Sequence, residues 1–440
     1  MRGLYLHRRF FLCLWIGVFA LILAFVFPGL YPWVIWGLTC LGFAWVLDVI
    51  LLYGYGQALE AWRVVGAKFS NGEDNPVRIQ VRSSYPFTVR LRILDELPAE
   101  FQLRTLALRF RLPPRGQQGV GYSLRPVKRG SYRFGQIRVF VTSCLSLVER
   151  RYSFAKEEEV AVYPSFIAMR KYELLAFASR QSGSGGKKMR VPGISTAFDQ
   201  IKPYVQGDDP RSVNWKATAK CRRLMVNAYT EERSQQVYCL IDKGRSMQAP
   251  FEGMTTLDYA INATLALSNV ILKKGDKAGL LTFANRIDSL LKADNRSLQL
   301  NRINEALYSQ QTHFLESDFE LLCTTVSRHV HTRSLLILFT NFDTVSGMKR
   351  RLPALKRLAD NHLLLLILFE NTEIRDVAAE PVSRMRDLYL KVLAGSFVSE
   401  KNRIAGELRG VGIYTILTEP RELTLQVING YLEMKERGLI

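Results

Sequence analysis

The sequence predicts a multi-domain protein with an N-terminal transmembrane helical hairpin, a small antiparallel β-sandwich-like module and a C-terminal doubly wound α/β domain. Three observations support this prediction. Two apolar stretches come first, an alternation of apolar and polar residues follows, and continuous apolar runs then alternate with helical patterns. A length of 440 residues leaves room for two or three folded units.

The hairpin is predicted within residues 1–55. Residues 10–27 carry no charge and residues 30–53 carry only Asp48, so each stretch is close to the roughly 20 residues that cross a bilayer as a helix. No small-residue cleavage site follows the first stretch and a second one comes at once, which favours a hairpin over a cleaved signal peptide. For Asp48, a carboxylate at the interface or paired with an arginine is favoured over a proton relay.

Basic residues set the expected orientation. Arg2, Arg8 and Arg9 precede the first span. The loop between the spans has no Lys or Arg, and Arg63 and Lys68 follow the second span. The positive-inside rule then predicts two passes, with both termini and the soluble domains in the cytosol. Six cysteines without zinc-ligand spacing agree with that reducing compartment.

The chain is strongly basic. It carries 60 Lys and Arg residues against 40 Asp and Glu residues, a formal net charge of +20. No recognisable nucleic-acid module accompanies this charge, so specific nucleic-acid binding is not expected. A cytosolic domain held near an anionic inner leaflet gains from basic residues, and we interpret the charge in that way.

Residues 56–170 are predicted to form the β-rich module. Apolar and polar residues alternate over Val77–Val81 and Val89–Ile93, and similar patterns cover Leu103–Leu112 and Tyr132–Val141. Turn-forming residues separate the runs, as in a small sandwich of short strands. The module has no histidine and no catalytic cluster, so we expect it to hold geometry or to bind a partner.

Residues 171–196 are expected to form a flexible, exposed linker. The run SRQSGSGGKK is rich in Gly and Ser and ends in basic residues. The phosphate-binding pattern G-x-x-x-x-G-K-[ST] is absent, since Lys188 is followed by Met189. Nucleotide binding is therefore not expected here.

Residues 197–440 show alternating strand and helix patterns. A strand predicted at Val237–Asp242 precedes a helix at Thr256–Lys273 and a strand at Ala278–Phe283. Further on, SLLILFT and HLLLLILF are continuous apolar runs, typical of strands that are covered on both faces. This alternation predicts a mostly parallel, doubly wound sheet.

A block rich in Gly, Asp, Pro, Arg and Trp, residues 198–232, precedes the first of these strands. Its specific pattern is carried by Tyr204, Gly207, Asp208, Asp209, Arg211 and Trp215. With the two spans and the β-rich module, the chain resembles, over nearly its whole length, the bacterial family called domain of unknown function fifty-eight. The run SCLSL at Ser143–Leu147 departs from it, because the family often has Asp-Pro-x-Gly-Leu there.

The resemblance also implies a cellular location, a fold for the C-terminal part and a partner. Members of this family are membrane-anchored, and their C-terminal part is similar to a von Willebrand factor A domain. It also implies a place in the bacterial inner membrane and a partner, an AAA+ ATPase of the MoxR type, in the assembly or maturation of other proteins.

Two interpretations of the Gly-Asp-Asp-Pro-Arg block stay open. In one, Asp208, Asp209 and Arg211 form an exposed surface for a partner, with Trp215 as its anchor. In the other, Gly207 permits a tight turn and Asp209 caps a short helix that continues through Trp215. Arg211 then pairs with a carboxylate, and Trp215 packs between domains. We favour this second, structural interpretation.

The resemblance further implies a divalent-cation site. Domains of the von Willebrand A type often hold a cation through Asp-x-Ser-x-Ser, a loop threonine and a later aspartate. The corresponding residues, for which Mg²⁺ is the fitting ion, are Asp242, Ser246, Thr312 and Asn341. Gly244 brings no side-chain oxygen, Asn341 brings no charge, and adjacent Lys and Arg residues weaken cation binding. We therefore favour loop capping by Asp242 and Ser246.

No catalytic constellation accompanies these features. The five histidines fit no metalloprotease pattern, and neither the G-x-S-x-G nor the kinase signature is present. We therefore expect a non-enzymatic, membrane-anchored scaffold or adaptor that works with a MoxR-type ATPase. The alternative is a metal-dependent hydrolase that uses the degenerate cation site. Binding of anionic lipid or nucleic acid is a third, accessory hypothesis.

Overall fold

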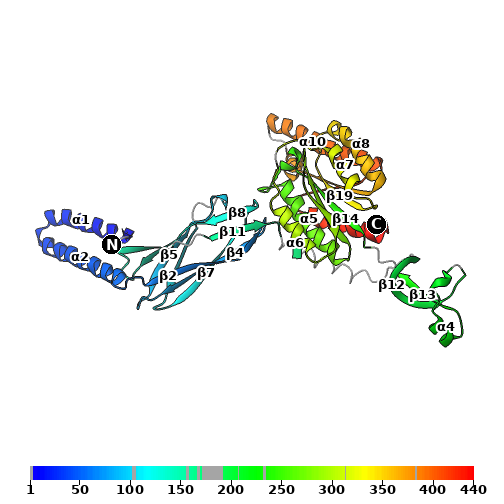
Figure 1. Ribbon diagram of the computed structural model, residues 1–440. Coiled ribbons are helices and arrows are strands. Elements are labelled where there is room, and N and C mark those ends of the chain that lie inside the picture. Colours follow the sequence, from blue (N-terminus) through cyan, green and yellow to red (C-terminus); the bar gives the residue numbers. More distant parts are fainter. Residues whose placement is uncertain are drawn as a thin grey trace. The chain divides into compact units, whose positions relative to one another are not determined.

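The computed structural model describes residues 3–101, 106–154, 158–165, 169–170, 192–206, 208–230, 234–312, 314–381 and 384–440. The chain forms two compact units, Met1–Tyr163 and Pro164–Ile440 (Figure 1). The first unit contains two apolar helices and a β-rich module, and the second contains a mixed α/β domain and a two-stranded segment. This order of apolar helices, β-rich region and α/β region confirms the coarse prediction.

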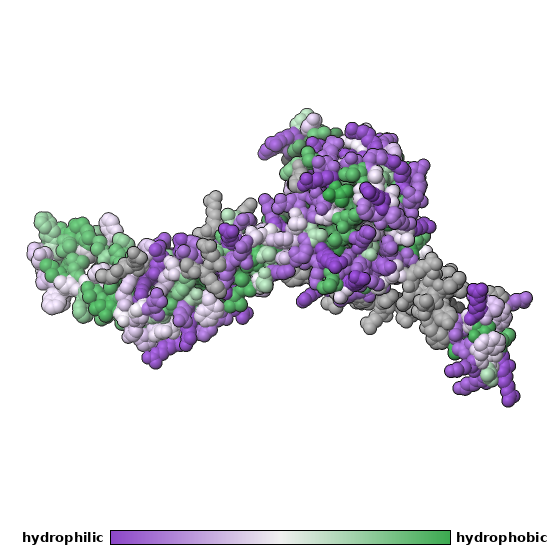
Figure 2. All heavy atoms as spheres, in the orientation of Figure 1, coloured by the Kyte–Doolittle hydropathy of each residue, from purple (hydrophilic) through white to green (hydrophobic). Residues whose placement is uncertain are grey.

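Two long apolar helices lie near the start of the first unit: α1 (Arg8–Val26) and α2 (Tyr31–Tyr53), joined by the 3-10 turn η1 (Pro28–Leu30). Both are long and apolar enough to cross a membrane, and only 6% of the residues in each apolar window are buried. The green surface around them in Figure 2 consists of exposed apolar side chains. A bilayer would cover such side chains.

The strands of the β-rich module are short and lie close together in the sequence: β1 (Leu4–Leu6), β2 (Leu59–Val65), β3 (Lys68–Ser70), β4 (Asn75–Ser83), β5 (Val89–Asp95), β6 (Leu106–Leu112), β7 (Gln117–Leu124), β8 (Gly130–Phe134), β9 (Ile137–Thr142), β10 (Val148–Phe154) and β11 (Glu158–Tyr163). They form a five-stranded sheet, β1-β10-β9-β5-β6, and two three-stranded sheets, β2-β4-β7 and β3-β11-β8. Neighbouring strands are antiparallel except β3 and β11. A 3-10 turn, η2 (Ala99–Phe101), follows β5.

Alternate side chains of these strands are buried, as the period of two predicts. Along β4 and β5 each buried position is followed by one that is at least partly exposed. The run predicted over Tyr132–Val141 differs, because it contributes β8 and β9 to two different sheets. The chain turns between them at Gly135, whose N–H donates to Glu96 O at 2.9 Å. Periodicity does not reveal such a corner.

A buried carboxylate fixes the end of α2 to strand β10. Asp48 is 0% exposed. Its Oδ1 accepts from Ser143 Oγ, and its Oδ2 accepts from the backbone N–H groups of Leu147 and Val148, both at 2.9 Å. Among the described residues, neutral donors rather than an arginine therefore hold Asp48, so the expected arginine pair is not found. The SCLSL turn supplies a hydroxyl and one amide, and Val148 of β10 supplies a second amide, which together stabilise a carboxylate just as well.

Arg150 of β10 adds a second connection. Its guanidinium donates to the carbonyl oxygens of Leu52 and Gly56, and the Tyr85 hydroxyl donates to Leu52 O at 2.9 Å. These donors satisfy carbonyl groups that a helix end leaves open. We refer to the contacts of Asp48 and Arg150 together as the α2–β10 joint.

The second unit contains one six-stranded sheet, formed by β14 (Gln236–Asp242), β17 (Lys277–Phe283), β18 (Ile287–Asp294), β19 (Leu335–Phe339), β20 (Leu363–Phe369) and β21 (Tyr414–Thr418). Their order is β18-β17-β14-β19-β20-β21, and all neighbours are parallel except the edge strand β18. The predicted parallel sheet is therefore found, with an antiparallel edge that the sequence analysis did not include.

Helices cover both faces of this sheet. One face packs against α5 (Thr256–Lys273), α6 (Gln299–Tyr308) and α11 (Leu423–Glu436). The other packs against α7 (Phe319–His329), α8 (Val345–Asn361) and α10 (Met385–Gly410). Successive residues of β14 are buried in opposite layers, which explains why its sequence is apolar throughout. Shorter elements are η4 (Arg245–Gln248), β15 (Pro250–Phe251), β16 (Met254–Thr255) and α9 (Thr372–Ala379).

The two-stranded segment consists of β12 (Pro192–Pro203) and β13 (Met225–Thr230), which are antiparallel, with η3 (Pro210–Ser212) and α4 (Trp215–Cys221) between them. The sequence predicted one helix from Asp209 through Trp215, but the structure has two. Asn214 is extended and caps α4, because its Oδ1 accepts from Ala217 N at 3.0 Å.

The expected linker at 171–196 is only partly described. Residues 171–191 lie outside the described residues, and β12 already begins at Pro192.

We expect Asp48→Ala to destabilise the first unit. The change leaves the N–H groups of Leu147 and Val148 without an acceptor, and each buried unpaired donor costs about 1–3 kcal/mol. Urea unfolding of the full protein in detergent should show a lower midpoint. Glu60→Ala, at an exposed position of β2, is the control and should leave the midpoint unchanged. An unchanged midpoint for Asp48→Ala would show that the joint does not hold the unit together.

Candidate functional site

The candidate site lies at the carboxyl ends of the parallel strands. From β14 the chain passes through α5 to β17 on one side, and it later reaches β19 on the other side of β14. The ends of β14 and β19 therefore flank a topological switch point, the usual place for a ligand in an open α/β sheet. Asp242 ends β14, and Thr340 and Asn341 follow β19.

Asp242 is the buried centre of this edge, with 1% of its surface exposed. Gly244 N donates to its Oδ1 at 2.8 Å, Ser317 Oγ also donates to Oδ1, and Thr340 Oγ1 donates to Oδ2 at 2.6 Å. Burial raises the pKa of the Asp242 carboxyl above its usual range, while these hydrogen bonds and the Arg351 charge act in the opposite direction. We refer to Asp242, Gly244, Ser317 and Thr340 as the Asp242 cluster.

The absence of a side chain at Gly244 makes the contact between Ser317 and Asp242 possible. A Cβ at position 244 would lie 2.1 Å from Ser317 Oγ and 3.1 Å from Asp242 Oδ1. The Ser317 hydroxyl therefore occupies the space that a side chain at position 244 would need. A serine at this position, as in Asp-x-Ser-x-Ser, and the observed Ser317 contact exclude one another.

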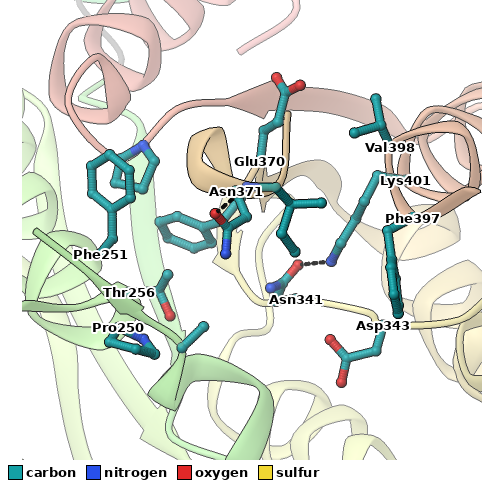
Figure 3. A pocket seen from close by; sticks show the side chains of 14 residues that line it. Pro250, Phe251, Thr256, Asn341, Asp343, Glu370, Asn371, Phe397, Val398 and Lys401 are labelled. Atoms are coloured by element: carbon teal, nitrogen blue, oxygen red, sulfur yellow. Dashed lines mark hydrogen bonds between the residues drawn. The ribbon is translucent and has the colours of Figure 1, made fainter. Parts of the chain in front are cut away.

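Asn341, predicted as a cation ligand, has a different partner. Its Oδ1 accepts from the ammonium group of Lys401 (Figure 3). The same ammonium group donates to Phe342 O at 2.6 Å. Ser246 is half-buried in η4, and its hydroxyl is not among the hydrogen-bond donors to Asp242 in the described part of the chain.

The loop hydroxyl that reaches Asp242 belongs to Ser317 rather than to Thr312. Thr312 Oγ1 instead accepts from the backbone N–H of Phe314 at 3.3 Å. Arg245 N donates to Leu315 O at 3.0 Å, which holds the residues just before α7 against the loop after β14. This backbone contact brings Ser317 to the carboxylate.

The Asp242 cluster does not fit a magnesium ion well, although it contains oxygen atoms of the kind that Mg²⁺ prefers. Its single carboxylate already accepts from three donors, so the hydroxyls of Ser317 and Thr340 would have to turn away for a cation to bind. The ammonium groups of Lys243 and Lys401 also lie at this edge, and nearby cations oppose cation binding. The magnesium site stays a prediction that this geometry does not favour.

Three important positions were not found from the sequence: Ser317, Thr340 and Lys401. Thr340 did carry a signal, since it directly precedes Asn341 at the end of an apolar run. Ser317 is 75 positions from Asp242, and Lys401 is 60 positions from Asn341, and no spacing rule connects residues so far apart.

The Gly-Asp-Asp-Pro-Arg block lies between β12 and β13. Asp208 accepts from Lys202 Nζ at 2.8 Å and from Val205 N at 3.0 Å, and the hydrogen bond from Lys202 holds the pKa of Asp208 below its usual value. Asp209 caps η3, because its Oδ1 accepts from Arg211 N at 2.9 Å. Both aspartates therefore shape the turn.

Other residues of this block are exposed. Trp215 is 73% exposed, and the exposed Arg211 forms no ion pair with any carboxylate of the described residues, so the packing and pairing expected for them are not found. Tyr204 is half-buried, and its N–H donates to Leu224 O at 2.9 Å. Gly207 lies outside the described residues.

A second candidate surface lies on α10. Met385, Leu388, Tyr389 and Val392 follow the spacing i, i+3, i+4 and i+7, which places them on one face of the helix. They are 82%, 45%, 68% and 63% exposed, in that order. Leu408, on the opposite side of α10, is buried against the sheet. We refer to these four exposed residues as the α10 face.

We expect Gly244→Ser to lower the free energy of unfolding, because the new side chain must displace Ser317 from Asp242. Overpacking of this kind costs about 1–3 kcal/mol. Ser317→Ala alone should also destabilise, by about 1.5–3 kcal/mol, since it removes a hydrogen bond to a charged group.

The double variant Gly244→Ser/Ser317→Ala tests this explanation. Its loss should be smaller than the sum of the two single losses, because the truncated residue no longer occupies the space that the new serine needs. Urea unfolding gives the free energy of unfolding of the wild type, the two single variants and the double variant, each with and without Mg²⁺. Additive losses would contradict steric exclusion between positions 244 and 317, and a rise in the wild-type midpoint with Mg²⁺ would support the cation site.

Residues 200–375 match the family model described as "Protein of unknown function DUF58". The uncharacterized protein YeaD of Bacillus subtilis is 26% identical over 161 residues, which is 37% of this chain and 38% of YeaD. The match therefore spans well under half of that relative.

Among solved structures, the ASH/PapD-like domain of human CEP192 matches with 12% identity over 25% of this chain and 87% of that domain's chain, at a TM-score of 0.20. The CARDB domain of the PF1109 protein from Pyrococcus furiosus matches with 14% identity. The match covers 24% of this chain and 91% of that domain's chain, at a TM-score of 0.17. At these TM-scores neither has a bearing on fold or function. Residues 200–375 and the similarity to YeaD therefore relate this part of the chain to the DUF58 family, whose function is unknown.

Proposed function

We propose that the protein is a membrane-anchored adaptor that binds another protein through its α/β domain. The helix pair α1 and α2 holds the chain in the bacterial inner membrane, with both termini and the soluble parts in the cytosol. The partner is a MoxR-type AAA+ ATPase, and the two proteins act together in the assembly or maturation of other proteins. The adaptor itself is not an enzyme.

The α10 face is the observation that carries this proposal. Met385, Leu388, Tyr389 and Val392 form one exposed stripe on α10, and further apolar residues of the same half of the helix, among them Leu390 and Phe397, are exposed as well. Single exposed apolar residues are ordinary, whereas a contiguous stripe is typical of an interaction surface. Burying one such side chain contributes about 1.5–3 kcal/mol of favourable free energy, so a partner groove that covers the stripe would add to the binding free energy.

We also propose that the α/β domain has the von Willebrand factor A fold. The parallel order of β17, β14, β19, β20 and β21, the antiparallel edge strand β18 and an aspartate at the end of β14 support this assignment. In this chain, hydrogen bonds to Asp242 take the place that a cation would have.

The alternative function, a metal-dependent hydrolase, has weaker support. It requires a cation that activates water, and the hydrogen bonds within the Asp242 cluster oppose cation binding. The residues proposed to bind the partner need no such chemistry.

Membrane topology provides the first test. The arginines at the start of α1 and the basic residues after α2 favour cytosolic soluble parts. Protease added to intact spheroplasts should leave the C-terminal unit uncut, whereas the same protease should digest it in inside-out vesicles. Digestion in intact spheroplasts would refute the orientation.

Partner capture provides the second test. Crosslinked pull-down from native membranes should recover the MoxR-type ATPase with the wild-type chain. Met385→Ser/Tyr389→Ser should reduce recovery at least about tenfold, because losing two buried anchors at an interface typically costs more than 1.4 kcal/mol. Trp215→Ala tests separately whether the Gly-Asp-Asp-Pro-Arg block contributes an anchor.

Leu425→Ser is the matched control, since Leu425 is an apolar residue of α11 that is 38% exposed and lies outside the α10 face. It should leave recovery unchanged. Equal recovery with wild-type protein and with the α10 variant, both correctly folded, would exclude the α10 face as the binding surface.

A further inference from the structure

A pocket of about 190 Å³ opens at the carboxyl ends of β19 and β20, beside α9 and α10 (Figure 3). Apolar side chains form much of its wall, among them Phe251, Phe369, Ile374, Phe397 and Val398. An apolar cavity of about 150 Å³ is large enough to hold benzene, so this pocket has room for a ring-sized apolar group.

Lys401 brings a positive charge to this pocket, and among the described residues it forms no direct ion pair. Its ammonium group donates to two neutral acceptors, Asn341 Oδ1 and Phe342 O. An ammonium group has three donors, so one is left over. No carboxylate of the described residues lies within ion-pair distance of it. Burial lowers the pKa of Lys401 to about 8, and the charges of Asp343 and Glu400 offset this effect only in part.

We propose that this pocket binds a carboxylate that carries an apolar group, with the Lys401 ammonium group as its counter-ion. The remaining N–H of Lys401 donates to the carboxylate. The apolar group fills the space between the rings of Phe251 and Phe397, which lie on opposite sides of the pocket in Figure 3. An anion at this position compensates the cost of a buried, unpaired cation.

Two helix N-termini also favour an anion. Asn371, the N-cap of α9, and Thr256, the first residue of α5, both line the pocket. The peptide dipoles place roughly half a positive charge at such a helix end. Asn371 Oδ1 accepts from Ile374 N at 3.2 Å, so its side-chain NH₂ group remains as a donor for the ligand.

Two carboxylates, Asp343 and Glu370, also line the pocket, and they oppose an anion. Asp343 is exposed, so water and salt screen its charge more than they screen the half-buried Lys401. The Glu370 carboxylate points away from the Lys401 ammonium group in Figure 3. The position next to Lys401 therefore favours an anion, while the outer part of the pocket does not.

This ligand chemistry has two sources, a small carboxylate and the free C-terminus of a protein chain that ends in an apolar residue. Neither the α10 face nor an ATPase partner contributes to this pocket, so binding of these probes can be tested independently of the proposed function. Matched probes distinguish the sources: N-acetyl-phenylalanine and its uncharged amide, and a hexapeptide that ends in phenylalanine with a free or an amidated C-terminus.

Isothermal titration of the full protein in detergent measures binding of each probe. N-acetyl-phenylalanine should bind, and its amide should bind at least about tenfold more weakly, because the charge-assisted hydrogen bond to Lys401 is lost. If the free hexapeptide binds much more tightly than N-acetyl-phenylalanine, the natural ligand is a chain end. Equal affinities identify a small carboxylate.

Two variants test the site itself. Lys401→Met should abolish the preference for the free acid, whereas Lys391→Met on the same helix should not change it, since Lys391 does not line the pocket and donates to Glu380 O at an exposed position. Ile374→Trp fills the pocket while keeping Lys401, and it should abolish binding even if Lys401→Met does not fold. Binding of acid and amide with equal affinity, unchanged binding by folded Lys401→Met, or no binding of any probe would each overturn the proposal.

Discussion

The need to satisfy one buried carboxylate organises the carboxyl edge of the α/β sheet. Asp242 ends β14 with almost no exposure, so its oxygens must find donors within the protein. They find them in Gly244, Ser317 and Thr340, which belong to three separate stretches of chain. The pocket lies apart from this cluster, at the carboxyl ends of β19 and β20.

The first unit solves the same physical problem with similar groups. Asp48 lies in an apolar helix and is satisfied by a serine hydroxyl and two backbone amides, as Asp242 is by two hydroxyls and one amide. Neutral donors arranged around a carboxylate can stabilise its charge without a basic partner. In contrast, the hydrogen bonds of Lys401 within the described residues go to neutral acceptors, and Asp343 and Glu400 act on its charge without a direct contact, which is why we assign a ligand to that position.

Sequence patterns predicted the elements well where one periodicity governs a whole segment. The helix Thr256–Lys273 and the two continuous apolar strands were predicted from local signals alone. The patterns did not reveal contacts between distant segments. Whether Thr312 or Ser317 reaches Asp242 depends on a backbone hydrogen bond from Arg245 to Leu315, and nothing in the local sequence encodes that pairing. The contact between the Lys401 ammonium group and Asn341 could not be predicted for the same reason.

The α2–β10 joint has a mechanical consequence. Transmembrane helices change their tilt when the thickness of the surrounding bilayer changes. A flexible connection would absorb that motion, but Asp48 and Arg150 bind the last turns of α2 directly to a strand of the five-stranded sheet. If α2 spans a bilayer, any tilt of the helix is therefore passed on directly to the sheet that contains β10.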